Sequence, residues 1–203
     1  NLPDGLSLNI SFDRSTYVKA AIFEIWKTLA IAFVLVTLII FLFLGNIKSV
    51  IVPAVALPVS LIGTFLGLWI FDLSINIFVL LSFILAIGII TDDSVIMTDA
   101  IYQRIEDGQT PLVASFLGAK SVTAPIISTT LVLVASFAPL IFLSGITGTL
   151  FRETAIALSF AIVVSSFVAL TLSPALAANF LSKNMKKSKI VLKFEKHYKS
   201  FLE

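Results

Sequence analysis

Two adjacent carboxylates, Asp92 and Asp93, stand inside one of the most apolar runs of the sequence. Residues 75–87 before them carry no charge, and after them the chain stays mostly apolar as far as Ile101. If this run is a membrane-spanning helix, a rise of about 1.5 Å per residue puts Asp92 roughly 13 Å inside Ile101, within the hydrocarbon. Ionisable groups at that depth are costly, so they usually mark a path for protons or ions.

The spacing of the pair limits the chemistry that it can perform. Neighbours on a helix point about 100° apart, so the two carboxylates do not face each other as a catalytic acid dyad would require. We therefore expect no enzyme activity. Desolvation and mutual repulsion disfavour double ionisation, so the pair is expected to bind and release protons as a coupled unit. The alternative is a structural pair that lines a water-filled pocket between helices.

The pair has no obvious counter-charge in the sequence. None of the fourteen Lys and Arg residues lies deep in a predicted span, since Lys27 and Lys120 fall at helix ends. An ionised carboxylate in the membrane needs a cation nearby. The cation must therefore come from outside this chain, or the pair must be held protonated.

Other polar side chains near the pair are candidates for proton access. Thr91 directly precedes the pair, and Asp99 lies two turns nearer the end of the same helix. Asp99 could lead protons to the pair, or it could belong to a solvated helix end. On the next predicted span, the hydroxyls of Ser128, Thr129 and Thr130 could extend the path or could satisfy their own backbone.

The composition is that of a membrane protein. Of the 203 residues, 58% are hydrophobic and only 13% are charged, and the mean hydropathy is +1.07. In soluble proteins, about a quarter of all residues are charged. The chain has no Cys, which excludes a disulfide framework and a thiolate metal site. We expect no bound cofactor or metal.

The hydrophobic runs predict an all-α membrane protein, a bundle of five transmembrane helices within residues 15–182. A helix from Ser15 is expected to lead without a break into the first span, and a tight turn is expected at residues 45–48. Residues 112–119 are too short to span and predict a surface helix. Gly63 and Gly67 have a spacing that lets another helix approach closely. The predicted spans are residues 29–44, 50–70, 75–101, 122–143 and 154–181.

Both ends of the chain lie outside this bundle. Residues 6–13 alternate between apolar and polar, the period of a half-buried strand. A single strand does not fold alone, so residues 1–14 are expected to end an extramembrane domain whose remainder is missing. Residues 183–203 place apolar side chains on one helical face and lysines on the others, which is typical of an interfacial amphipathic helix. A solvated linker is the alternative.

The distribution of Lys and Arg predicts the orientation. One side of the membrane carries ten of these residues, seven of them between Lys183 and Lys199, and the other side carries four. The richer side is expected to be cytoplasmic. With five crossings, the N-terminus is then periplasmic and the C-terminus cytoplasmic.

Several short motifs occur in an order and spacing shared with one family. The motifs are FLFLGNIKSVIVP at 41–53, ALPV at 56–59, SIN at 74–76, LAIG at 85–88 before Asp92 and Asp93, GITG at 145–148 and LSPAL at 172–176. On these motifs, over nearly the whole chain, the sequence resembles the resistance–nodulation–division (RND) superfamily of proton-driven exporters, most closely its hydrophobe and amphiphile efflux branch.

The resemblance implies the second to sixth transmembrane helices of an N-terminal half, preceded in residues 1–14 by the end of a periplasmic porter domain. It implies that Asp92 and Asp93 take up protons and engage a lysine of the other half. It further implies an inner-membrane proton/drug antiporter that works as a homotrimer with an adaptor and an outer-membrane channel. The exported compound is not indicated, because drug pockets of this family lie in the periplasmic domain.

A different class of function is also open. A five-helix segment of this superfamily is similar to the sterol-sensing domain, a lipid-binding regulatory module without transport. The acidic pair favours the pump, since a lipid sensor has no evident need for it. Two positions differ from the family pattern and bear on proton access: Thr91 stands where aliphatic residues are common, and Asp99-Ala100 replaces a frequent Glu-Asn.

Overall fold

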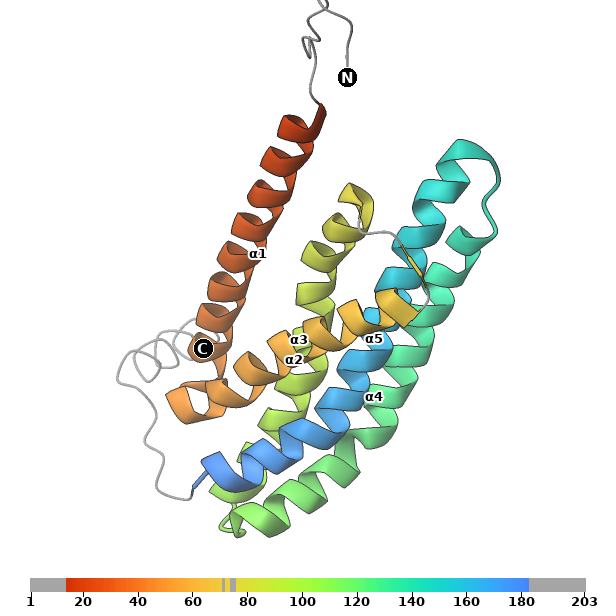
Figure 1. Cartoon of the computed structure of the whole chain (residues 1–203). Coiled ribbons are helices and arrows are strands. Elements are labelled where there is room, and N and C mark those ends of the chain that lie inside the picture. Colours follow the sequence, from red (N-terminus) through yellow and green to blue (C-terminus); the bar gives the residue numbers. More distant parts are fainter. Residues whose placement is uncertain (1–13, 71, 74–75, 183–203) are drawn as a thin grey trace, which may run out of the picture.

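The computed structural model describes residues 14–70, 72–73 and 76–182, which form five α-helices and no strand. The helices alternate in direction, so the described chain enters at one end of the bundle and leaves at the other (Figure 1). All five are long and apolar enough to cross a membrane. The strand predicted at 6–13 and the amphipathic helix predicted at 183–203 lie outside the described residues. The helices are α1 (Arg14–Leu44), α2 (Ile47–Ile70), α3 (Ile77–Glu106), α4 (Pro111–Ile141) and α5 (Gly145–Phe180).

The predicted turn between α1 and α2 forms, but it is limited to residues 45–46, because α2 already begins at Ile47. α1 begins at Arg14, so the predicted lead-in helix does run without a break into the first span. Gly45 then adopts a φ of +70°, a conformation that glycine enters without a steric cost. The Asn46 side chain accepts a hydrogen bond from the Lys48 backbone N–H at 2.8 Å and starts α2. The chain therefore reverses within two residues.

The glycine pair of α2 packs against α5. A Cβ at Gly67 would lie 1.8 Å from the Phe160 ring, and one at Gly63 would lie 2.7 Å from Val164 Cγ1. No side chain larger than hydrogen fits at Gly67 without displacing the ring. The predicted close approach of another helix is confirmed, and α5 is that helix. Figure 1 shows α2 crossing α3 and α5 at a steep angle.

The expectation of a separate surface helix at residues 112–119 is wrong. These residues form the first turns of α4, which continues without interruption to Ile141. The residues between 119 and 122 include no Gly or Pro, so nothing ends the helix there. Pro125 bends α4 instead, because its ring removes one backbone hydrogen bond. The lower part of α4 lies at an angle to the upper part (Figure 1).

The fifth span also begins earlier than predicted. The sequence suggested a loop at 144–148 and a helix from about Thr154, whereas α5 starts at Gly145 with Ser144 as its N-cap. A Cβ at Gly148 would lie 2.1 Å from the Leu143 carbonyl oxygen. The glycines therefore allow the first turn of the helix to fold close against the preceding chain.

α3 and α5 form the centre of the bundle. Half of the span of each is buried, against 12% for α1 and 11% for α4. Hydroxyl groups join the two central helices: Ser165 Oγ donates to the Ile90 carbonyl at 2.8 Å, and Ser173 Oγ lies 3.4 Å from Ser94 Oγ. Small polar side chains of this kind let membrane helices pack closely. α5 therefore holds α3 by one face.

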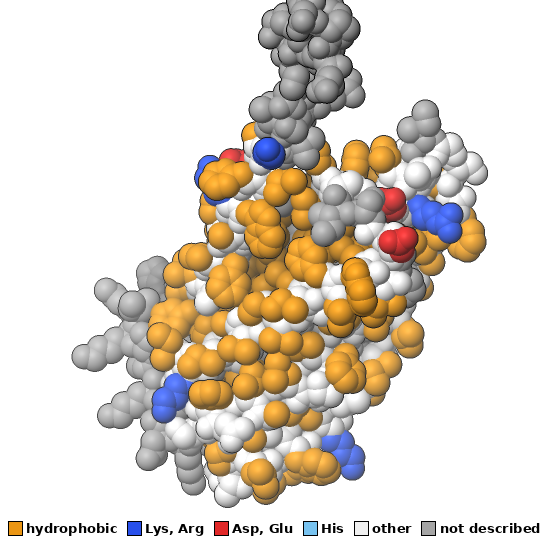
Figure 2. Space-filling view, viewed as in Figure 1, with side chains coloured by type: hydrophobic (Ala, Val, Ile, Leu, Met, Phe, Trp, Pro, Cys, Tyr) orange, Lys and Arg blue, Asp and Glu red, His pale blue; other side chains and the backbone are white. Residues whose placement is uncertain are grey.

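The outer surface is mostly apolar. Figure 2 shows hydrophobic side chains across the middle of the bundle and charged side chains gathered toward its two ends. Many large hydrophobic side chains are exposed, such as Val34 and Leu131 at 64% and 65%. Because water-soluble proteins rarely expose such wide apolar areas, this surface is that of a multi-pass membrane protein.

Candidate functional site

Asp92 and Asp93 lie in the middle of α3, at the edge of the side that the other helices leave uncovered. Asp92 is exposed and Asp93 is half-buried. One stripe of α3 stays exposed for four turns and consists of Leu81, Leu85, Gly88, Asp92 and Ile96. Nothing lies within 4 Å of the position that a Cβ of Gly88 would take. The stripe therefore presents a carboxylate between apolar neighbours.

Both carboxylates line one groove between α3 and α4. The groove has a volume of about 410 Å³ and is mostly apolar. Although neighbours on a helix diverge, Asp92 and Asp93 flank the same space, so a proton or a cation entering it can interact with either. The lining residues are Ile89, Asp92, Asp93 and Ile96 from α3, and Ser128, Thr129, Val132 and Leu133 from α4.

The structure brings two of the three predicted hydroxyl residues to the pair. Ser128 and Thr129 line the groove, whereas Thr130 is buried away from it. The Thr130 hydroxyl donates to the Ile126 carbonyl at 2.7 Å, and that of Thr129 reaches the same carbonyl at 2.9 Å. The expectation that these hydroxyls satisfy their own backbone is confirmed for both threonines. Ser128 and Thr129 are thus the hydroxyl residues that line the groove beside the carboxylates.

The two predicted access residues lie apart from the groove. Thr91 is buried, and its hydroxyl donates to the carbonyls of Ile87 and Gly88, both at 2.9 Å. Asp99 is half-buried farther along α3 and accepts a hydrogen bond from Gln103 Nε2 at 2.7 Å. Neither side chain lines the space in front of the carboxylates. Neither Thr91 nor Asp99 therefore offers a proton a route through this groove.

No cation faces the pair within the part of the chain that the structure describes. The ion pair found there joins Lys27 to Glu24 at 3.1 Å on the exposed start of α1, far along the chain from α3. The groove contains no basic side chain. In the described ranges, no cluster of three His, Cys, Asp or Glu side chains could hold a metal ion either. The carboxylates thus remain without a positive partner among these residues.

A polar link at the start of α3 was not foreseen from the sequence. Asn76 is the N-cap of α3 and accepts from the Val79 N–H at 2.9 Å, while its side-chain amide donates to Glu153 of α5. An Asn directly before an apolar helical run is a recognisable N-cap signal. Its partner lies 77 residues away, so only the folded chain reveals it. The link fixes the end of α3 on α5, and with it the position of the carboxylates.

The chain is similar to a family of bacterial transporters. The sequence model of the AcrB/AcrD/AcrF family matches residues 1–203. An uncharacterised transporter of Haemophilus influenzae is 39% identical over 185 residues, which are 91% of this chain and 18% of the relative. The multidrug resistance protein MdtC of Pectobacterium carotovorum is 40% identical over 188 residues, or 93% of this chain and 18% of that protein. MdtC of Yersinia enterocolitica is 39% identical over 181 residues, with 89% and 18% covered. The chain thus spans less than a fifth of the length of these relatives.

Proposed function

The chain belongs to the AcrB/AcrD/AcrF family, and we propose that it is the proton-relay half of an inner-membrane proton/drug antiporter that exports hydrophobic or amphiphilic compounds. The resemblance to proton-driven exporters noted in the sequence is confirmed by this match. One observation carries the proposal: Asp92 and Asp93 line a groove in mid-span, and no basic side chain shares it. Acids at that depth are functional by default.

The proposed cycle uses the two protonation states of the pair. Ionised carboxylates attract a cation carried by a part of the protein that lies beyond this chain. Proton uptake at Asp92 or Asp93 removes the charge and releases that cation, so the two parts can shift relative to each other. For the shift to drive export, the two arrangements must differ in proton affinity.

The attachment of α3 to α5 supports this cycle. Ser165 and the Asn76–Glu153 link hold α3 on α5, so the carboxylates move with the whole bundle. At the end where the chain enters, the first turns of α1 stand apart from the other helices (Figure 1). In our proposal this helix transmits the movement to an extramembrane domain.

The location and partners belong to the same proposal. The count of Lys and Arg supports a periplasmic N-terminus and a cytoplasmic C-terminus in the inner membrane. The family supports a homotrimer that works with an adaptor and an outer-membrane channel. Two relatives are named multidrug resistance proteins, which supports drugs as the exported class. The family match gives no support to the sterol-sensing alternative.

Asparagine substitutions test the relay. In the full-length protein, Asp92→Asn and Asp93→Asn keep the size and polarity of the side chain but remove the carboxyl group that takes up and releases a proton. We expect export of an amphiphilic dye to fall to the level measured when the proton gradient is collapsed. Asp107→Asn, at the exposed C-cap of the same helix, is the matched control and should export normally. Proton-driven export that survives both substitutions would refute the relay and favour a structural pair.

A further inference from the structure

A second groove lies between the first turns of α4 and the last turns of α5. Its volume is about 680 Å³, within the range of about 300–1,000 Å³ that is typical of sites for small molecules. Six residues from α4 line one wall, and Leu170, Pro174 and Ala178 of α5 line the other. The walls are almost entirely apolar. At 75% and 70% exposed, Leu112 and Phe116 are among the most exposed apolar side chains of the bundle.

One buried polar group in this groove has no partner. Ser115 lines the groove and is only 4% exposed, yet its hydroxyl has no hydrogen-bond partner among the described residues. The threonines farther along α4 donate to the carbonyl four residues back, and Ser115 does not. A buried hydroxyl without an acceptor costs free energy, so an acceptor on a bound molecule would relieve it.

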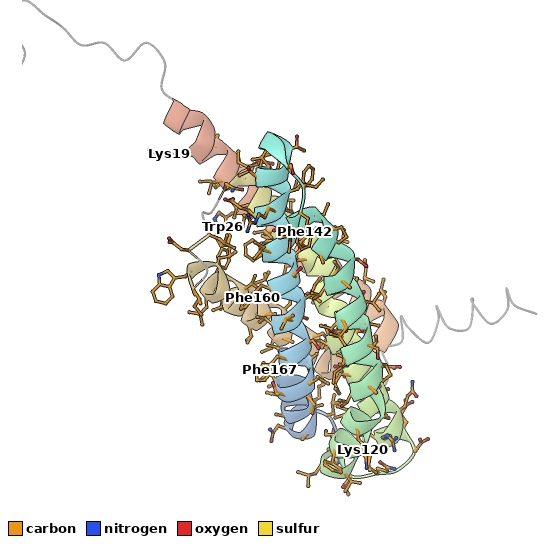
Figure 3. All side chains as sticks on the ribbon, turned by 90° about the vertical axis from the view of Figure 1, so that its right-hand side faces the viewer. Lys19, Trp26, Lys120, Phe142, Phe160 and Phe167 are labelled. Atoms are coloured by element: carbon orange, nitrogen blue, oxygen red, sulfur yellow. The ribbon has the colours of Figure 1, made fainter. Side chains whose placement is uncertain are left out.

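A positive charge stands beside the groove. Lys120 lies one turn after Phe116 on the same face of α4, and a helical side chain leans toward the preceding turn. It is exposed and forms no ion pair with any described residue. Figure 3 shows Lys120 at the opposite end of the bundle from Lys19 and Trp26. This end is where the headgroups of one membrane leaflet would lie.

We propose that this groove binds an anionic phospholipid. An acyl chain lies between Leu112 and Phe116 of α4 and the α5 wall, the Ser115 hydroxyl donates to a glycerol ester carbonyl, and Lys120 pairs with the negative headgroup. The combination of an apolar channel, one buried donor and one peripheral cation matches a lipid and would suit neither a soluble anion nor a purely apolar compound. The proposal does not depend on the proton relay.

Photo-crosslinking tests which molecule occupies the groove. In the full-length protein, Phe116 is replaced by the photoreactive residue p-benzoylphenylalanine, and the protein is placed in vesicles of phosphatidylcholine containing a minor share of phosphatidylglycerol. We expect crosslinks to phosphatidylglycerol well above its share of the lipid. Crosslinks to another part of the protein, or crosslinks that only follow the lipid composition, would overturn the proposal.

Substitutions in the same background separate the contacts. Lys120→Gln should lower phosphatidylglycerol crosslinking about fivefold and leave phosphatidylcholine unchanged, since one lysine near the surface contributes about that much. Ser115→Ala should lower both about threefold, because both lipids carry the ester carbonyl. Ala178→Phe should fill the groove and abolish both. If Lys120→Gln and the protein with Lys120 in place crosslinked phosphatidylglycerol equally, the proposed contact between Lys120 and the headgroup would be overturned.

Two controls match these variants. Lys48→Gln removes another exposed lysine, which lies on α2, a helix that contributes no residue to the groove, and should leave crosslinking unchanged. Ala124→Phe adds the same bulk to an exposed site on α4 that also lies outside the groove. If Ala124→Phe abolished crosslinking as Ala178→Phe does, the effect would come from bulk on the surface, and the groove would be excluded as the site.

Discussion

The two faces of α3 differ in how far the rest of the chain covers them. On the inner face, Ile90, Met97 and Ile101 are at most 1% exposed, and hydroxyl contacts tie the helix to α5. On the outer face, Leu85 is 57% exposed and the carboxylate of Asp92 stands uncovered. Other helices of this chain cover the inner face, and their packing stabilises the fold. The described residues leave the outer face uncovered, and the carboxylates lie there.

The largest effect on stability is expected from a cavity on the inner face. Ile90→Ala should lower the free energy of unfolding by about 2–5 kcal/mol, because the surrounding helices cannot close the space left by the side chain. Leu85→Ala on the outer face should change it little. Unfolding of the full-length protein in detergent measures both. Equal losses would mean that the outer face is packed as tightly as the inner one.

Adding volume where α4 meets α3 should be the next largest effect. A Cβ at Gly118 would lie 2.8 Å from Ile101 Cγ1 and 3.0 Å from its Cα. Because backbone atoms cannot move aside cheaply, Gly118→Leu should cost about 1–3 kcal/mol or more in the same unfolding measurement. A variant as stable as the natural protein would show that α4 can move away from α3 without cost.

The matching substitution on the outer face should leave stability alone and affect export. A Cβ at Gly88 would meet nothing within 4 Å, so Gly88→Leu should change the unfolding free energy by about 0.5 kcal/mol or less. If another helix of the full protein packs beside the carboxylates, the added side chain keeps it away. Export of the dye should then fall severalfold, with Gly88→Ala as the milder control. Unchanged export in Gly88→Leu would indicate that lipid covers this face.

Among the changes on the inner face, the smallest loss of stability is expected from one interhelical hydrogen bond. Ser165→Ala removes the bond to the Ile90 carbonyl and should cost about 0.6 kcal/mol, the average measured for such bonds between membrane helices. Ser136→Ala is the control, since that exposed hydroxyl bonds only within its own helix. A loss of several kcal/mol in Ser165→Ala would make this contact, and not apolar packing, the main attachment of α3.

The sequence by itself determined the number of membrane-spanning helices, their order and the candidate carboxylates. Hydrophobic runs of about 20 residues define spans because the bilayer has a fixed thickness, and an acid inside such a run is conspicuous. The turn at Gly45 and the close packing at Gly67 were also predictable, since both depend on the absence of a side chain. The helix ends at 111 and 145 were not, because hydropathy does not mark where a helix continues beyond the membrane.

Only the tertiary structure decided what surrounds the carboxylates. Period and hydropathy do not say which neighbour covers which face of α3, and the answer depends on contacts between residues 75 or more positions apart, such as Ser165 with Ile90. The fold turned Thr91 inward, brought Ser128 and Thr129 beside Asp92 and Asp93, and left one side of α3 open. Sequence placed the charges at a depth in the membrane, and packing fixed the direction in which they face.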